Sequence, residues 1–277
     1  MKKTILITGA SSGIGAATAQ LFLNKGWNVI ATMRNPEQQT TLINSDQLLL
    51  TRLDVQDLDS IQNAVNLGID KFGGIDVLVN NAGYGAYGPL ESFSREQITR
   101  QFATNVIGLL DVTKAILPHF RAKQSGILIN ISSVGGKFAL PLGSLYHGTK
   151  FAVEGISESL SYEVAQFGGQ VKIIEPGAVM TDFMTRSLDF SNDESMLEYQ
   201  PLVQKVMTGV PEFYKDASPA NVTAEVIFEA ATDGKDQLRY TAGEDAKLMI
   251  SQRKQADDGT VMSWVKTLFG ISPIFTV

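Results

Sequence analysis

Tyr146 and Lys150 are the two side chains whose types and spacing most directly suggest chemistry. We expect a helix to begin near Tyr146, and residues four apart on a helix share one face. A phenol has an ordinary pKa of about 10, and a nearby ammonium or a helix N-terminus favours its ionised form. Lys150 should therefore lower the pKa of Tyr146, so that the phenol can exchange a proton with a substrate oxygen. Alternatively, Tyr146 is a half-buried packing residue, because this two-residue pattern is common by chance.

The segment before this helix brings hydroxyl groups to the same region. Residues 127–131, ILINI, form an apolar run that is typical of a parallel strand buried on both faces. Ser132 and Ser133 follow the strand, and a glycine-rich loop leads on to Tyr146. A serine hydroxyl at this strand end could hydrogen-bond the oxygen on which the phenol acts.

A glycine-rich turn near the N-terminus predicts a phosphate site. The strand TILIT at residues 4–8 is followed by GASSGIG and then by a helix that stops at Gly26. In this context Gly9 permits the tight turn, Gly13 lets a phosphate approach, and Gly15 lets helix and strand pack closely. The N–H groups of the helix N-terminus would face a pyrophosphate. A turn that uses its glycines only structurally is the less favoured alternative.

The second strand, WNVIATM, selects between two nicotinamide cofactors. It ends at Met33 and Arg34, the position where a carboxylate would bind the 2′-hydroxyl of an adenosine ribose. No carboxylate is present, and a guanidinium suits a 2′-phosphate. The sequence therefore predicts NADP rather than NAD. The alternative is that Arg34 is a solvated surface residue.

Two more strand ends carry polar residues toward the same edge of the sheet. Asp54 and Val55 end the third strand. Asp54 could cap the next helix, which starts near Asp57, or contact the adenine, and the two roles are compatible. Residues 80–83, Asn-Asn-Ala-Gly, follow the fourth strand. Their small side chains would admit a flat cofactor, and the amides could fix the sheet edge.

The remaining pattern alternates helices with strands. Residues 94–123 read as one helix with Asn105 inside it, where asparagine is unfavourable, and with Pro118 bending or shortening its end. The strand at 171–175 is broken by Pro176 and Gly177, and residues 178–181 continue as a loop. This alternation predicts a single doubly wound α/β domain of the Rossmann type.

Composition excludes several functions. The chain has 277 residues, a net charge of −6, no cysteine and only two histidines, His119 and His147. We therefore expect no metal site, no disulfide and no nucleic-acid partner. We also expect no membrane span and a cytoplasmic location, because no apolar run approaches the roughly 20 residues of a span and the N-terminus lacks a signal peptide.

The ordered motifs TGASSGIG, LDV, NNAG, YHGTK and EPGAVMT resemble those of the short-chain dehydrogenase/reductase family from about Thr4 to about Tyr240. The interval of 13 residues between Ser133 and Tyr146 also fits and selects Ser133 over Ser132. The strand end IATMR and the segment LRYTAGEDAKLM look like the hydroxysteroid and retinol dehydrogenase branch. The resemblance implies a parallel seven-stranded sheet flanked by helices and an enzyme that interconverts a carbonyl and an alcohol with NADP.

The resemblance also assigns roles by position. Tyr146 would donate the proton, Ser133 would polarise the carbonyl, Lys150 would lower the phenol pKa and bind the nicotinamide ribose, and Asn105 would hold a relay water. Val179 and Thr181 would fix the carboxamide and pyrophosphate side of the cofactor. The residues assigned to the cofactor are Gly9, Ser11, Ser12, Gly13, Ile14, Gly15, Arg34, Asp54, Val55, Asn81, Ala82, Gly83, Tyr146, Lys150, Pro176, Gly177, Val179 and Thr181.

Residues 180–215 correspond to the variable substrate loop of the family and are rich in aromatic and apolar side chains. They form either an adaptable lid over a lipophilic substrate, such as a steroid, a retinoid or an aromatic compound, or a pair of helices packed on the body. Residues 244–277 are predicted as a helical tail packed on the 1–243 domain, covering the substrate entrance or a subunit interface. His147, beside Tyr146, is either a pocket residue or a residue that faces solvent, and we favour the solvent-facing alternative.

Alternatives remain for the activity. An acyl-carrier ketoreductase would use the same chemistry, whereas a non-catalytic NADP(H)-sensing regulator would be expected to lack the tyrosine or the lysine, and both are present. The resemblance implies a homodimer or homotetramer. The substrate, the direction and the stereochemistry do not follow from the sequence.

Overall fold

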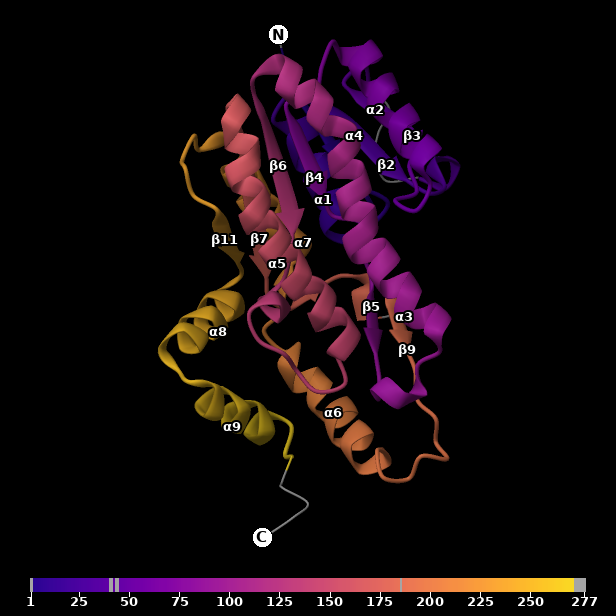
Figure 1. The fold of residues 1–277 in the computed structure, drawn as a ribbon, viewed down its shortest axis with the longest axis vertical. Coiled ribbons are helices and arrows are strands. Elements are labelled where there is room, and N and C mark those ends of the chain that lie inside the picture. The colour runs from indigo at the N-terminus through magenta and orange to yellow at the C-terminus, as the bar shows by residue number, and fades with distance from the viewer. Residues whose placement is uncertain (1, 40–41, 43–44, 185, 272–277) are drawn as a thin grey trace.

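The structure is a computed structural model that describes residues 2–39, 42, 45–184 and 186–271. A parallel sheet lies in the middle of the molecule, with helices on both of its faces (Figure 1). Within the described residues the sheet has seven strands in the order β11-β7-β6-β4-β1-β2-β3. These are Thr4–Ile7 (β1), Asn28–Met33 (β2), Leu48–Arg52 (β3), Val77–Asn80 (β4), Gly126–Ile131 (β6), Gly169–Pro176 (β7) and Arg239–Ala242 (β11). The predicted doubly wound parallel sheet is confirmed.

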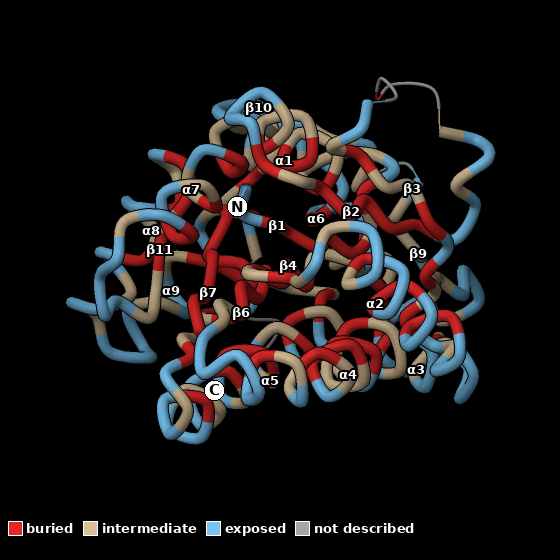
Figure 2. Tube along the Cα trace, turned by 90° about the horizontal axis from the view of Figure 1, so that it is seen from above, coloured by how far each residue is buried: buried red, intermediate tan, exposed pale blue. Residues whose placement is uncertain are grey.

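The strands are buried on both faces, as their continuous apolar runs require. Ile5 and Ile7 of β1 pack with helices α1 (Gly13–Asn24) and α7 (Ala220–Thr232). Leu6, between them, packs with the helices of the opposite face. That face is covered by α2 (Leu58–Phe72), α4 (Gly108–Lys123) and α5 (Ser144–Val164), and Figure 2 shows the two helical layers with the sheet between them.

The chain reverses its direction across the sheet between β1 and β4. These strands are parallel neighbours, and the chain continues to β2 on one side and to β6 on the other. In open sheets of this kind, ligands bind outside the carboxyl ends of the strands at the switch point.

The predicted helix over residues 94–123 is interrupted. It consists of α3 (Arg95–Phe102), a π turn at Ala103–Ile107, and α4. Asn105 lies in the π turn, a distortion that is frequent at functional sites. Pro118 does not end the helix, which runs on to Lys123.

The variable segment has more structure than a loop. Val179–Met180 (β8) pairs with Ser218–Pro219 (β10), so the loop predicted at 178–181 contains a short strand. Leu188–Phe190 (β9) pairs with Gly85–Tyr87 (β5), and α6 follows at Gln200–Phe213. Of the two alternatives for residues 180–215, the pair of helices is therefore wrong: the described part of the segment has one α-helix and two short strands. Single helical turns lie at Pro36–Gln38 (η1), Leu90–Ser92 (η2), Val134–Gly136 (η4), Ala165–Phe167 (η5) and Asp182–Met184 (η6).

The C-terminal segment is helical, as predicted, with α8 at Glu244–Gln255 and α9 at Asp258–Leu268. Ile250 of α8 packs with Phe138, and the Trp264 ring of α9 lies edge-on to the Phe138 ring with centroids 5.6 Å apart. The domain boundary at residue 243 stays a prediction, and residues 272–277 of the tail lie outside the described residues. Within the described ranges, no helix has the length and apolar character needed to cross a membrane.

Candidate active site

A cleft of about 520 Å³ lies at the carboxyl ends of the sheet strands. The loops that follow β1, β2, β3, β4, β6 and β7 all contribute to its walls. Every predicted site residue lines this cleft except Gly15 and Asn105. The tertiary structure therefore brings together side chains that are spread over most of the chain, although their roles stay predictions.

The glycine turn at one end of the cleft requires glycine at two positions for different reasons. Gly9 has a φ of +68°, and an added Cβ would lie 2.9 Å from the Cα of Ala82. A Cβ on Gly15 would lie 2.4 Å from the carbonyl oxygen of Gly9. Ser12 makes no side-chain cap at the N-terminus of α1, so the first N–H groups of the helix are not satisfied by it. A backbone of this shape at a helix N-terminus fits a pyrophosphate.

Thr8 and Asn81 fix this turn against β4. The Asn81 amide nitrogen donates to the carbonyl oxygens of Thr8 (2.9 Å) and Gly9 (3.1 Å). The Thr8 hydroxyl accepts from the backbone N–H groups of Asn81 and Ala82, both at 3.0 Å. The predicted role of the asparagine amides in fixing the sheet edge agrees with these bonds. Thr8 was missed as a supporting residue, although its place as a polar residue between a buried strand and Gly9 was a usable signal.

Arg34 and Asp54, which follow β2 and β3, line the same cleft. Arg34 is exposed, and none of the described residues forms an ion pair with its guanidinium. Asp54 does not cap α2: its carboxylate accepts from the N–H of Gln56 (3.0 Å), whereas Asp57 caps the helix by accepting from the N–H of Ser60 (3.1 Å). The capping alternative for Asp54 is therefore wrong, because the chain turns once more before the helix begins.

Tyr146, Lys150 and Ser133 meet at the floor of the cleft. Tyr146 and Lys150 lie on one face of α5, with the Lys150 ammonium 5.7 Å from the centroid of the Tyr146 ring. The Ser133 hydroxyl accepts from the N–H of Gly135 (3.0 Å) and hydrogen-bonds the Tyr146 phenol. Both Tyr146 and Lys150 are half-buried, with their remaining exposure toward the cleft.

The charge states of this group differ from the sequence-based expectation. Burial raises the pKa of Tyr146 to about 12, a rise that the hydrogen bond with Ser133 partly offsets. Burial also lowers the pKa of Lys150 to about 8, against the opposing effect of the Glu154 carboxylate. The expected lowering of the phenol pKa by Lys150 is thus absent from this structure, because the loss of solvation of the phenolate dominates. Tyr146 is consequently a protonated donor at neutral pH.

Asn105 does not line the cleft but hydrogen-bonds residues next to it. Its side-chain nitrogen donates to the carbonyl oxygen of Tyr84 (2.9 Å) and to the Thr149 hydroxyl (3.1 Å), and its oxygen accepts from the N–H of Tyr84 (3.1 Å). Thr149 in turn donates to the carbonyl oxygen of Tyr146 at 2.7 Å. Asn105 therefore ties α5 to the loop after β4, and its predicted part in a water relay stays a prediction.

His147 was expected to face solvent, and this expectation is wrong. The imidazole is buried, accepts from the N–H of Leu140 at Nε2 (3.0 Å) and donates from Nδ1 to the carbonyl oxygen of Gly135 (2.9 Å). Burial lowers its pKa, so the neutral ring persists. His147 fixes the loop between β6 and α5, because that loop folds back over the helix start.

The other half of the cleft has aromatic walls that the sequence did not assign. The ring centroids of Tyr87 and Phe183 lie 5.4 Å and 5.6 Å from that of Tyr146, and Tyr214 lines the same space. These residues come from β5, η6 and the end of α6. The aromatic content of residues 180–215, which suggested an apolar lid, was the available signal in the sequence. The sequence did not show which residues elsewhere in the chain these side chains would contact.

An ion pair lies in the cleft lining near these aromatic residues. Arg100 of α3 forms an ion pair with the Asp189 carboxylate of β9 and donates from Nε to the Tyr84 hydroxyl (3.3 Å). Gln97 also donates to Asp189, at 3.2 Å. The strand β9 is therefore held against α3 as well as against β5. In the described part of the chain, no group of three or more His, Asp or Glu side chains is arranged to hold a metal ion.

Known proteins resemble this chain over most of its length. A sequence profile of the short chain dehydrogenases matches residues 3–191, which include Ser133, Tyr146 and Lys150. An uncharacterized oxidoreductase of Schizosaccharomyces pombe is 44% identical over 239 residues, 86% of this chain and 100% of that protein. Retinol dehydrogenase 8 of Bos taurus is 35% identical over 196 residues, 68% of this chain and 62% of that protein. A solved structure of a short-chain dehydrogenase from Streptomyces avermitilis matches with a TM-score of 0.83 at 32% identity, covering 98% of both chains.

Proposed function

The chain belongs to the short-chain dehydrogenase family of oxidoreductases, and on this premise we propose that it interconverts a carbonyl and an alcohol with NADP(H), using Tyr146 as the general acid–base. The observation that carries the proposal is the meeting of Ser133, Tyr146 and Lys150 on the floor of a cleft whose other end is a glycine-lined helix N-terminus.

The chain's own residues supply proton transfer and orientation. Tyr146, whose pKa burial raises to about 12, is protonated and can donate to the carbonyl oxygen of a bound ketone. Ser133 donates a hydrogen bond to the same oxygen and polarises the carbonyl. The positive charge of Lys150 favours the phenolate as the proton leaves. Bound NADPH supplies the hydride.

The residues at the other end of the cleft fit this cofactor. The turn from Gly9 to Gly15 would hold the pyrophosphate, and the exposed guanidinium of Arg34 would hold a 2′-phosphate. No carboxylate occupies the position of Met33 or Arg34, where one would favour NAD. We therefore assign NADP.

The aromatic walls favour a lipophilic substrate that is steroid-like, retinoid-like or aromatic. Tyr87, Phe183 and Tyr214 offer flat, largely apolar surfaces beside Tyr146. The similarity to a retinol dehydrogenase points the same way. An acyl-carrier substrate and a purely cofactor-sensing role remain as outcomes of the test below.

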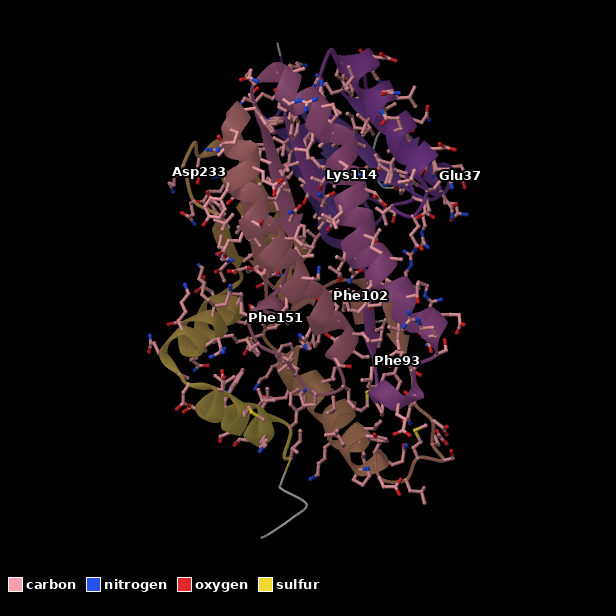
Figure 3. The ribbon with its side chains drawn as sticks, viewed as in Figure 1. Glu37, Phe93, Phe102, Lys114, Phe151 and Asp233 are labelled. Carbon is pink, nitrogen blue, oxygen red and sulfur yellow. The ribbon has the colours of Figure 1, made fainter. Side chains whose placement is uncertain are left out.

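We also infer a homodimer or homotetramer built on the faces of α4 and α5. Phe102 and Phe151, labelled in Figure 3 on the side where α3, α4 and α5 lie, have 37% and 47% of their surface exposed. Ile107 is 53% exposed in the turn between α3 and α4. Exposed large apolar side chains that gather on one side of a molecule are typical of an interaction site. Sedimentation of the wild type and of Phe151→Glu would test it, with the variant shifting toward the monomer.

The test of the activity is oxidation of NADPH and NADH by the purified protein with a panel of steroid, retinoid, aromatic, short-chain and acyl-carrier-linked carbonyls. We expect turnover of lipophilic ketones with NADPH and a fall of about 10³-fold in Tyr146→Phe. The matched control is Tyr240→Phe, because that buried phenol donates to Asp233 outside the cleft (2.8 Å) and its loss should leave turnover unchanged. Tight NADPH binding without turnover of any carbonyl would favour the sensor instead.

A further inference from the structure

Three tyrosines from different parts of the chain converge on the substrate half of the cleft. Tyr87 lies on β5, Tyr146 on α5, and Tyr214 directly after α6, and all three line the cleft while remaining half-buried. The rings of Tyr87 and Tyr146 are 5.4 Å apart at an interplanar angle of 31°. The phenols of Tyr146 and Tyr214 both add to the raised pKa of Tyr87, as expected of three hydroxyl groups that face a common space.

Two of these three phenols have no hydrogen-bond partner within the described part of the chain. Ser133 hydrogen-bonds Tyr146, but among the residues that the structure describes none hydrogen-bonds the hydroxyl of Tyr87 or Tyr214. The other phenols with restricted exposure are paired: Tyr84 accepts from Arg100 and Tyr240 donates to Asp233. Burial raises the pKa of both Tyr87 and Tyr214, so each is a protonated donor at neutral pH. A confined donor that stays unpaired is unfavourable and is expected to bond a ligand or a water.

The side chains that line the cleft with Tyr87 and Tyr214 indicate whether these phenols would bind a charged or a neutral group. Arg100 of the cleft lining is already engaged by Asp189 and Tyr84, and Lys150 donates to the carbonyl oxygen of Ile131 at 2.8 Å. Arg186 is paired with Asp182 at 3.5 Å and has a side chain that is 70% exposed. Apolar and aromatic side chains also line the cleft, among them Leu140, Phe183 and Phe213, and the carboxylates of Asp182 and Asp189 in the lining are ion-paired. Two neutral donors among apolar walls suit a neutral oxygen acceptor rather than a carboxylate.

We propose that Tyr87 and Tyr214 form a subsite for a second oxygen of the substrate, so that the preferred substrates are lipophilic ketones with a neutral hydroxyl or carbonyl oxygen a few bonds from the reacting carbonyl. This inference rests on the proposed function, because it places the reacting carbonyl at Tyr146. Tyr146 and Ser133 bind the first oxygen, and the second oxygen accepts from Tyr87 or Tyr214. The subsite therefore selects hydroxyketones and ketoesters over plain ketones.

The test compares three substrates of equal chain length: a long-chain α-hydroxyketone, the matching β-ketoester and the plain ketone. We expect kcat/KM with NADPH to be about tenfold higher for at least one oxygen-bearing substrate than for the plain ketone, the gain from one additional buried hydrogen bond. Tyr87→Phe or Tyr214→Phe should reduce this preference about tenfold. Tyr199→Phe is the matched control, because the Tyr199 hydroxyl donates to Glu91 (2.9 Å) and lies outside the cleft lining. It should leave the preference unchanged.

A second measurement separates failure of the subsite from failure of the proposed reaction. Binding of the same three compounds to Tyr146→Phe, saturated with NADPH, is measured by calorimetry. Tighter binding of the oxygen-bearing compounds without any turnover by the wild type would uphold the subsite and overturn the reaction. Equal kcat/KM and equal binding for all three compounds, or a preference that survives both tyrosine variants, would overturn the subsite.

Discussion

The Lys150 ammonium donates a hydrogen bond of 2.8 Å to the backbone carbonyl oxygen of Ile131. Ile131 is the last residue of β6, immediately before Ser132 and Ser133, so this bond ties α5 to the strand end that carries Ser133. Lys150 thereby has a positioning task as well as an electrostatic one. The hydrogen bond restricts the position of the Lys150 ammonium, so a change of pH near its pKa alters the charge of this side chain rather than its place.

The charge of Lys150 should make the rate of ketone reduction depend on pH. Burial lowers the pKa of Lys150 to about 8, so the ammonium is present below pH 8 and is lost as the pH rises through that value. Tyr146 stays protonated over the same range because its pKa is about 12. We expect kcat/KM for ketone reduction to fall above about pH 8, because the neutral amine no longer favours the phenolate. Lys150→Arg, which stays charged, should lack this inflection, and an unchanged profile in that variant would assign the inflection to another group.

The lowered pKa of Lys150 should also make the free energy of unfolding depend on pH. A lysine whose pKa is lowered on folding contributes stability that is present above its unfolded pKa of about 10.5 and is lost as the pH falls through the folded value of about 8. We expect the unfolding free energy of Lys150→Met to depend less on pH than that of the wild type between pH 8 and pH 10. Denaturant titrations at both pH values measure the difference. Equal slopes for the two proteins would contradict the shifted pKa.

The proposed preference for NADP over NAD should depend on Arg34. We expect Arg34→Ala to raise the KM for NADPH about 10- to 100-fold, the effect of losing charged hydrogen bonds to a 2′-phosphate, and to leave the KM for NADH unchanged. Arg52→Ala is the control, because Arg52 on neighbouring β3 pairs with Asp57 and does not line the cleft. A wild type that prefers NADH, or a variant that loses both cofactors equally, would contradict the assignment of NADP.

Gly15 is required by packing alone. A Cβ there would lie 2.4 Å from the Gly9 carbonyl oxygen and 2.6 Å from the Asn81 amide nitrogen, and the backbone oxygen has no room to move. We expect Gly15→Ala to lower the unfolding free energy by about 1–3 kcal/mol and to weaken NADPH binding, because the turn must shift. In Gly259→Ala the new Cβ meets only the Asp257 carboxylate, at 3.6 Å, so little change is expected. Thermal melts with and without NADPH would decide, and equal melts would refute the packing argument.

Arg239 compensates two buried carboxylates. Its Nε lies 2.9 Å from Glu154 and 3.7 Å from Glu175, whose side chains are 6% and 3% exposed. Burial raises the pKa of Glu175, and removal of the cation would raise it further. We expect Arg239→Met to lower the unfolding free energy by about 3 kcal/mol at pH 8, the lower end of the cost of breaking a buried ion pair.

The loss in Arg239→Met should be smaller at pH 5. A carboxyl group with a raised folded pKa is least costly below its unfolded pKa of about 4.5 and becomes more costly as the pH rises. Denaturant titrations at the two pH values measure this, with Arg52→Met as the exposed control, for which we expect almost no change. A loss that is independent of pH would show that Arg239 acts through packing rather than charge.

The sequence by itself determined the fold and the local geometry of the site. Continuous apolar runs such as residues 127–131 are typical of strands buried on both faces, and the alternation of strands with helices then leaves few arrangements other than the observed sheet. The spacing of Tyr146 and Lys150 and the glycines of the first turn are local features, because they depend on helix period and backbone freedom.

Only the tertiary structure decided the environment of those groups. The sign of the pKa shift at Tyr146 depends on how completely the phenol is buried by Tyr87 and Phe183, residues that are distant in the sequence. The burial of His147 depends on how its loop folds back, which no periodicity encodes. Solvation and long-range packing arise only in the folded chain. For that reason the aromatic residues that line the cleft beside Tyr146 could be identified only from the tertiary structure.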